Sequence, residues 1–495
     1  MSATGDAGEP RGPVLLDGAP SVDPPSGTDP ARQPRRAGWL SPLLLRLHFY
    51  AGVFVGPFVL VAATSGALYA LTPQVEQAVY DHELHAPAAA SQLALREQIL
   101  AADAYVGPDE QLVAVRPAPE PGDTTRVMYA GDDLGASETR AVFVDPATAE
   151  IRGDLTAYGT SGALPVRTWV TQLHRSLHLG EPGRLYSELA ASWLGVVALA
   201  GLGLWGTQRW RARRKKTRRP AASGPGYART RSRHTTTGLW VLGVALFLSA
   251  TGITWSEHGG GNVSDLRAAV GWTTPAVSTD LSGAGGAADE HAGHHGGGAP
   301  AGAVATTDVS RGAFDSVLTI AQDVNVDTGL VEIRPPTEAG AAWVVQEIQR
   351  SYPTEVDAVA IDGQTMQVVD RVDFDDFSLV AKLSRWGIDL HMGSMFGFVN
   401  QLVLFFAGSA IAAMVVWGYV MWWQRRPRRG TRRVGKPPER GVLRRAPWWG
   451  AALALLCAGA VGVFLPLMGL SLAAFVVVDL LVGALRAPRR SVPVR

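Results

Sequence analysis

Histidines stand at the starts of two similar apolar segments of this 495-residue chain. His48 precedes FYAGVFVGPFVLVAATSGALYAL, twenty-three residues without a charge, and His234 precedes TTTGLWVLGVALFLSATGITW. About twenty apolar residues are enough for a helix to cross a bilayer, so each run is a candidate membrane span. In both copies a glycine follows four positions after the histidine. Both copies also carry a later Ser/Thr-Gly pair: Ser65-Gly66 and Thr251-Gly252.

Three further histidines precede the apolar runs that return through the membrane. His174 stands five residues after Trp169, as His391 does after Trp386. Counting back from the Trp-Gly pairs near the ends of the following apolar runs instead aligns His391 nearest His178. A spacing of four places His174 and His178 on one face of a helix. We prefer His174 as the counterpart of His391, and keep His178 as a ligand, a residue that orients a ligand, or a relay.

Imidazoles at matched depth on facing helices are typical of sites that grip haem iron through two axial nitrogens. An ionisable residue inside a span also indicates function by default. The pattern therefore predicts two sites, one per leaflet: His48 with His234, and an outer site at His391 with His174 or His178. No spacing matches covalent c-type attachment, so we expect two non-covalent b haems. The alternative is a set of interfacial histidines that cap helix ends, which the duplication makes less favourable.

The distribution of charge predicts the orientation of the chain. Residues 209–233 hold eleven Lys/Arg and no acid, and residues 425–445 hold ten against one glutamate. The long segments 72–186 and 257–398 hold eight and seven Lys/Arg against sixteen and twenty Asp/Glu. By the positive-inside rule the basic segments are cytoplasmic and the acidic ones lie outside. We expect a multi-pass protein of the inner (plasma) membrane, embedded in the lipid bilayer, with both termini in the cytoplasm.

The remaining segments follow from composition. Residues 1–38 are rich in Pro, Gly and Arg and lack an apolar core, which predicts a disordered cytoplasmic tail. The lone cysteine, Cys457, excludes an intramolecular disulfide. The expected spans are 43–71, 187–207, 236–256, 398–423, 447–464 and 467–486, with basic loops at 208–235 and 424–446, outer segments at 72–186 and 308–397, and a flexible linker at 257–307.

The two outer segments repeat one another. Each has an amphipathic helix followed by three strand-like runs and a helix that carries histidine back towards the membrane, which predicts two small α+β domains. The strand-like runs lie at 111–115, 126–129 and 141–144 in the first segment and at 331–336, 343–348 and 359–365 in the second.

Three arginines and three linker histidines each have two interpretations, one as ligand-binding residues and one without a ligand. Arg46, Arg175 and Arg233 adjoin histidines and suit haem propionates, because guanidinium pairs well with carboxylate. They suit equally well the role of positive-inside anchors. His291, His294 and His295 lie in the Gly-rich linker, where flexible histidines bind copper or zinc weakly, although a solvated spacer is the better interpretation.

A glycine pattern in the second span bears on the electron donor. Residues 201–206 match G-x-G-x-x-G, but they lie inside an apolar helix with no strand before them, so helix packing explains them better. Without a dinucleotide site, electrons must come from a quinol or a separate cytoplasmic reductase. We expect no nucleic-acid partner.

Four stretches, RLHFYAGVF, LHRSLHLGEPGRL, VFVDPATAEIRG and DLHMGSMFG, resemble the PepSY-associated transmembrane proteins, which include iron-regulated membrane proteins and ferric-siderophore reductases. The resemblance covers about residues 40–490. It implies four core helices, two PepSY domains outside the membrane, and b-type haems that pass electrons outward to Fe(III). By match it implicates four ligands: His48, His174, His234 and His391.

The expected fold is an α-helical integral membrane protein of about six spans. A duplicated four-helix haem-binding core and a C-terminal hairpin carry two small α+β PepSY-like extracytoplasmic domains. The expected function is a di-haem b oxidoreductase that passes electrons to a ferric siderophore or another metal acceptor in iron acquisition. The catalytic residues stay unassigned. The alternatives are a non-enzymatic, membrane-anchored PepSY module that binds or regulates a partner, and a metal-uptake accessory protein.

Overall fold

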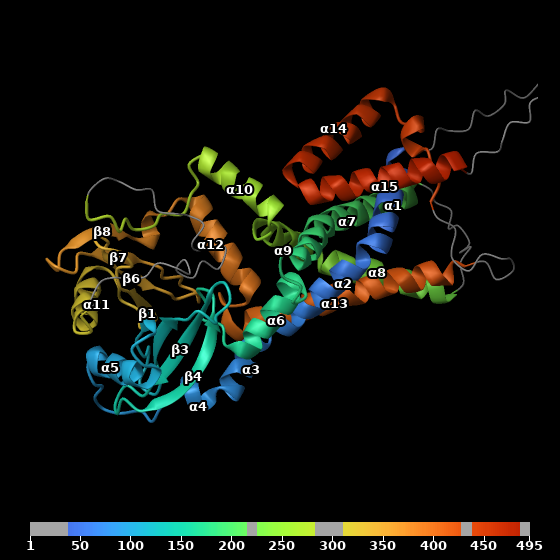
Figure 1. Cartoon of the computed structure of the whole chain (residues 1–495). Coiled ribbons are helices and arrows are strands. Elements are labelled where there is room, and N and C mark those ends of the chain that lie inside the picture. The colour runs from blue at the N-terminus through green and yellow to red at the C-terminus, as the bar shows by residue number, and fades with distance from the viewer. Residues whose placement is uncertain (1–37, 215–224, 283–309, 427–437, 486–495) are drawn as a thin grey trace, which may run out of the picture.

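A bundle of apolar helices lies at one end of the molecule and a β-sheet at the other (Figure 1). The computed structural model describes residues 38–214, 225–282, 310–426 and 438–485. The expected N-terminal tail, apart from Gly38, lies outside the described residues, as do the linker histidines His291, His294 and His295. The helices of the bundle are α1 (Leu40–Phe54), α2 (Gly56–Tyr69), α7 (Gly180–Arg214), α8 (Pro225–Trp240), α9 (Leu242–Thr254), α13 (Gly397–Gln424), α14 (Trp448–Phe464) and α15 (Pro466–Leu485).

Two of the apolar segments are bent rather than straight. α1 and α2 meet at 64°, and α8 and α9 meet at 62°. Pro57 stands in the first turn of α2, where its missing N–H is tolerated, but it cannot continue the ladder of the preceding helix. The second break has no proline and falls at Val241, between Gly238 and Gly243.

The bent pairs and the two long helices form a symmetric bundle. α1 packs on α7 and α8 packs on α13, whereas beyond each bend α2 packs on α13 and α9 packs on α7. Each bent pair therefore crosses from the long helix of its own half of the chain to that of the other half. This exchange brings the two repeats of the sequence into one bundle.

Length and apolar composition identify three helices as candidate spans: α7, α13 and α15. The number rises to five if each bent pair crosses the membrane as one span. The seventeen-residue α14 is apolar but shorter than the others. The described residues thus support a membrane protein with three to five candidate spans, and the predicted span 447–464, which corresponds to α14, is not among them.

The soluble part is one continuous sheet. Its strand order is β4-β3-β2-β1-β5-β6-β7-β8, with every neighbouring pair antiparallel. The two predicted domains join where Val115 of β1 pairs with Ile333 of β5. The strands are β1 (Gln111–Arg116), β2 (Thr125–Ala130), β3 (Glu138–Val144), β4 (Ile151–Tyr158), β5 (Val331–Arg334), β6 (Trp343–Glu347), β7 (Ala358–Ile361) and β8 (Val368–Val372).

Alternation along the strands gives the sheet two apolar faces. Val127 and Tyr129 of β2 face a core that is closed by α5 (Leu95–Val106) and α11 (Ala313–Val324). Met128, between them, faces the other side, where it packs with Phe143 and Leu164. One face of the sheet is therefore covered by its own helices, and the other is directed towards the elements that lead into the bundle.

Shorter elements connect the sheet to the bundle. α6 and α12 run from the sheet into the bundle (Figure 1). They carry His174 and His391 of the predicted outer site. The connecting elements are α3 (Thr72–Val79), α4 (Asp81–Leu84), α6 (Pro165–Ser176), α10 (His258–Ala269), α12 (Leu379–Met392) and the 3-10 helix η2 (Phe374–Asp376). A second 3-10 helix, η3 (Val442–Arg445), lies between α13 and α14 of the bundle.

Two regions that were predicted as irregular contain helix. α7 continues to Arg214 and α8 begins at Pro225, so most of the described part of the basic loop 208–235 is helical. Arginine is a good helix former and extends an apolar helix readily. The predicted linker 257–307 begins with α10, and its described remainder includes an isolated bridge between Asp280 and Ala341.

Candidate functional site

The histidine pair farther from the sheet, here the distal pair, consists of His48 on α1 and His234 on α8. Their ring centroids lie 6.0 Å apart with an interplanar angle of 80°. His48 Nδ1 lies 2.9 Å from the carbonyl oxygen of Val197 on α7. His234 Nδ1 lies 3.0 Å from the carbonyl oxygen of Met414 on α13. The two rings are held by equivalent contacts from the two halves of the chain.

These contacts fix which nitrogen is free. A carbonyl oxygen only accepts, so each Nδ1 carries the hydrogen and donates it. Each Nε2 is then left with a lone pair, the form in which imidazole binds a metal. Among the described residues, no hydrogen bond to either Nε2 is found. Since a metal–imidazole bond is about 2 Å long, two rings that share one metal have their centres roughly 6 Å apart, as this pair does.

The pair nearer the sheet, here the proximal pair, consists of His174 on α6 and His391 on α12. His174 Nδ1 lies 3.0 Å from Ser65 Oγ, and this hydroxyl donates to the carbonyl oxygen of Val61. His391 Nδ1 lies 2.5 Å from Thr251 Oγ1, which donates to the carbonyl oxygen of Phe247. Because each hydroxyl hydrogen is already used, each hydroxyl accepts from Nδ1–H. The proximal rings therefore also keep Nε2 for a ligand.

A cavity of about 350 Å³ opens between the proximal histidines, and both of them line it. Its other walls are mainly apolar and come from α2, α7, α9 and α13. Ligand cavities of small molecules and cofactors lie in this range of volume and character. The cavity therefore joins two metal-competent imidazoles to an apolar space inside the bundle.

Glycines make room for the histidine rings. A Cβ atom on Gly66 would lie 3.0 Å from His174 Cε1. A Cβ atom on Gly201 would lie 3.1 Å from His48 Cε1. Gly66 belongs to the Ser-Gly pair noted in the sequence, and Gly201 belongs to the glycine pattern of the second span. Both glycines serve close packing of a histidine ring against a helix.

Three guanidinium groups line the sheet-side part of the cavity: Arg175, Arg350 and Arg385. Arg175 donates to the hydroxyl of Tyr158 at 2.6 Å. Arg350 and Arg385 flank the fully buried Asp389, at 3.8 Å and 2.9 Å. With one carboxylate among three guanidiniums, this end of the cavity is positively charged and suits the acidic groups of a ligand.

Sequence reasoning singled out Arg175 but missed Arg350 and Arg385. Arg385 could have been found from its spacing to Asp389, because residues four apart form a pair on one helix face. Arg46 and Arg233 do not line the cavity. Arg46 is buried and bonds to Asp479 of α15 at 2.5 Å, whereas Arg233 is exposed.

His178 lies apart from both pairs. α6 ends at Ser176, and Leu177 and His178 both have left-handed backbone conformations, with φ of 53° and 56°. The prediction that His174 and His178 share one helix face is therefore wrong. The exposed ring of His178 lies against Trp169, with centroids 5.1 Å apart.

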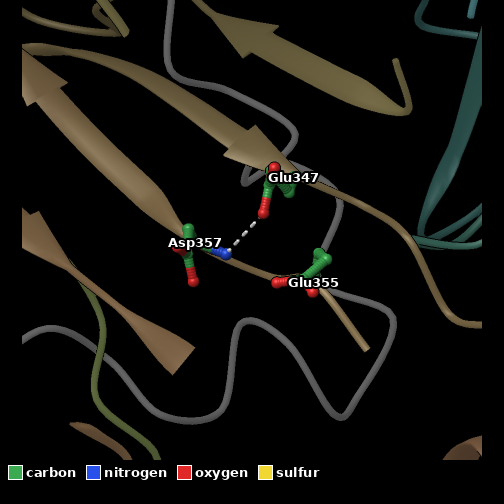
Figure 2. Close-up of side chains that lie close together, drawn as sticks. All are labelled: Glu347, Glu355 and Asp357. Carbon is green, nitrogen blue, oxygen red and sulfur yellow. Dashed lines mark hydrogen bonds between the residues drawn. The ribbon is translucent and has the colours of Figure 1, made fainter. Parts of the chain in front are cut away.

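An acidic cluster on the sheet is a second candidate for metal binding. Glu347, Glu355 and Asp357 have oxygens within 4.8 Å of one another (Figure 2). The carboxylate of Glu347 accepts from the backbone N–H groups of Asp327, Thr328 and Asp357. The pKa of each of the three carboxyl groups is raised, chiefly by burial. The cluster is explained by strand and turn contacts, so it carries no assignment.

The apolar bundle and the antiparallel sheet define a multi-pass membrane protein with a duplicated chain. A family profile described as the PepSY-associated TM region matches residues 45–425. The chain belongs to this family, as the sequence motifs predicted. No curated protein matches the chain in sequence.

Proposed function

We propose that the chain is a membrane electron-transfer protein with two b-type haems, one at each histidine pair. The observation that supports this most strongly is the common state of the four rings. In each of them Nδ1–H is engaged by an oxygen and Nε2 is free among the described residues. Imidazole Nε2 with an anchored Nδ1–H is the usual arrangement of an axial ligand.

Bound haem would supply iron that cycles between Fe(II) and Fe(III) and so carries one electron at a time. The chain does the rest. Val197, Met414, Ser65 and Thr251 orient the rings, and the apolar walls exclude water from the proximal cavity. Arg175, Arg350 and Arg385 would pair with the propionates of the proximal haem, since guanidinium suits carboxylate.

The orientation follows from charge. The described parts of the two basic segments (209–214, 225–233, 425–426 and 438–445) lie at the end of the bundle away from the sheet (Figure 1). The positive-inside rule then favours a cytoplasmic location for that end. The acidic sheet is then outside. His48 and Ser65 are seventeen residues apart along α1 and α2. At 1.5 Å per residue this is roughly 25 Å along a straight helix, and less with the bend, which puts the two pairs at different depths.

In this proposal electrons enter from a quinol or a cytoplasmic reductase and leave at the sheet side. The acceptor is a ferric siderophore or another Fe(III) chelate, as in the reductases that the family includes. Histidine pairs at both depths support a relay across the membrane better than a single internal site does.

The test uses the purified chain in sealed liposomes, with haem reduced and a membrane-impermeant ferric chelate added outside. Reoxidation of haem with formation of Fe(II) outside is expected. His391→Ala should lose the proximal haem and this activity, whereas His178→Ala should keep both. A protein that binds haem but is not reoxidised contradicts the proposal, and a colourless protein favours an anchored binding module.

A further inference from the structure

A second cleft, of about 520 Å³, lies between α3 and the face of the sheet directed towards the bundle. Gln74 and Glu76 of α3 form one side. Arg126 of β2, Arg167 of α6 and the turn at Ser161 form the other. Two guanidiniums against one carboxylate give the cleft a net positive charge, although the outer segments as a whole are acidic.

The guanidinium of Arg126 has no direct ion pair with a carboxylate among the described residues. Its neighbour across the sheet, Arg116, is held by Glu332 at 2.7 Å. Arg126 instead lies over the ring of Phe143 and has one long hydrogen bond, 3.4 Å to the carbonyl oxygen of Gly162. No carboxylate lies within ion-pair distance of Arg126 in the described parts of the chain. Glu76 and Asp123 act on Arg126 only from beyond ion-pair distance. A largely desolvated cation with no direct ion pair is costly, so the cleft favours an anionic ligand.

Burial acts on the same group. Burial lowers the pKa of Arg126 to about 10, and the nearby charge of Arg116 adds to the effect. The guanidinium remains charged at neutral pH, and an anion in the cleft would relieve both costs. Arg167 differs, because it already donates to Glu76 at 3.4 Å and to the hydroxyl of Tyr69 at 3.0 Å.

The cleft and the haem cavity share a wall. Ser161 lines both of them. Tyr69, which accepts from Arg167, lines the cavity, and Arg167 lines the cleft. A ligand in the cleft is therefore separated from the proximal cavity by one layer of side chains, which is a short path for an electron.

We propose that this cleft binds the electron acceptor, and that the acceptor is an anionic, carboxylate-bearing Fe(III) chelate anchored by Arg126. The inference rests on the proposed electron-transfer function and adds the chemical class and place of its acceptor. Reduction of such a chelate would require one electron, which a haem held by His174 and His391 would supply as its iron is oxidised from Fe(II) to Fe(III). The chelated Fe(III) would become Fe(II), with no proton transferred. A lipid headgroup offers similar charge, but the shared wall with the cavity favours the chelate.

The experiment measures binding without redox chemistry, so it stays informative even if the chain holds no haem. Gallium(III)–EDTA is an anionic and redox-inert analogue of the ferric chelate. Its equilibrium dialysis against the full chain in uncharged detergent, with gallium measured by mass spectrometry, should show saturable binding. Arg126→Gln should weaken binding about tenfold, the loss expected for one charge-assisted contact.

Two more variants guard against misfolding as the cause. Gln74→Glu adds one negative charge at the exposed rim of the cleft and should also weaken binding of gallium–EDTA. Arg140 belongs to the same sheet but pairs with Asp154 and does not line the cleft. Arg140→Gln should therefore leave binding of gallium–EDTA unchanged.

Equal binding to wild type and Arg126→Gln, or no binding of gallium–EDTA at all, would overturn the proposal. Displacement of the chelate by short-chain phosphatidylglycerol at lower concentration would assign the cleft to a lipid headgroup and also overturn it. A colourless chain that still binds the chelate through Arg126 would instead refute the haem assignment and keep the anion site.

Discussion

At the level of single residues, the proposed function rests on four histidine rings, and the orientation of each ring depends on one oxygen atom that contacts its Nδ1. Val197 and Met414 supply backbone carbonyls, whereas Ser65 and Thr251 supply side-chain hydroxyls. Only the hydroxyls can be removed by substitution. The proximal pair therefore offers a test of ring orientation that leaves the histidines themselves in place.

Ser65→Ala and Thr251→Ala should each leave a proximal ring without its Nδ1 partner. Loss of such a partner typically costs 10- to 100-fold in metal affinity, so we expect release of the proximal haem about tenfold faster, measured by transfer to apomyoglobin. The distal haem should be unaffected. Thr64→Ala is the control, because the Thr64 hydroxyl donates to the carbonyl oxygen of Leu60 in its own helix and contacts neither histidine pair among the described residues. Equal release from all three variants would show that the hydroxyls do not hold the rings.

Much of the candidate site was visible in the sequence at this scale. The repeat identified the four histidines and also the Ser/Thr-Gly pairs that prove to contact the proximal rings. It did not reveal Arg350 and Arg385, because Arg350 lies in a loop far along the chain and reaches the cavity only through the fold. It also misplaced His178, because a left-handed turn ends α6 before that residue.

At the scale of the element, apolar runs and interior strands were predictable and the edges were not. Runs of apolar residues marked every bundle helix except α8, most of which lies in the predicted basic loop 208–235. The strands β4 and β8 were missed, and they are the two edges of the sheet. Edge strands carry charged residues that mask their pattern, such as Arg152 and Asp154 in β4 and Asp370 and Arg371 in β8. The bends within two spans also left little trace, since only the first contains a proline.

The C-terminal hairpin docks on the bundle through a charge inside an apolar helix. Asp479 of α15 bonds to Arg46 at 2.5 Å and to Arg440 at 3.3 Å. Charged residues inside apolar helices are rare, and those that occur usually pair with another charged residue. Arg46 stands two residues before His48, so the hairpin supports the helix that carries the distal pair.

Asp479→Asn should leave Arg46 without a charged partner. We expect a loss of about 1–3 kcal/mol in the free energy of unfolding, below the usual figure for a fully buried pair because both groups keep some solvent contact. Thermal unfolding followed by circular dichroism in detergent measures it. Glu439→Gln, at an exposed pair with Arg445, should change stability little. Equal stability of Asp479→Asn and wild type would contradict this role of the hairpin.

At the scale of the whole molecule, one sheet joins the two repeats. The sequence predicted two small α+β domains but not the sheet that they share, because repeated strands do not reveal which edges will pair. β1 and β5 pair where the two repeats meet, here called the seam, and Arg116 of β1 forms an ion pair with Glu332 of β5 there. The bundle is also joined across the repeats, because α2 packs on α13 and α9 packs on α7. The duplicated chain is therefore one structural unit, with its sites between the halves.

The ion pair at the seam should make stability depend on pH. Burial acts to raise the pKa of Glu332, but the charges of Arg116 and Arg334 outweigh it and hold that pKa below the ordinary 4.5. A lowered pKa in the folded state gives stability that is present above 4.5 and is lost as pH falls through the folded value.

We expect Glu332→Gln to be less stable than wild type at pH 7, by about 1–3 kcal/mol. The gap should shrink as pH falls below 4.5, because wild-type Glu332 is then protonated as well. Thermal unfolding of both proteins between pH 7 and pH 3 compares them while all other groups titrate alike. A gap that stays constant with pH would show that the charge of Glu332 does not stabilise the seam.

The most direct test of the central claim is a dithionite-reduced minus oxidised visible spectrum of the purified chain, with haem quantified per chain. We expect a b-type spectrum and two haems, falling to one in His48→Ala and in His391→Ala. A protein from haem-replete cells that shows no haem, or both single variants with two haems, would contradict it.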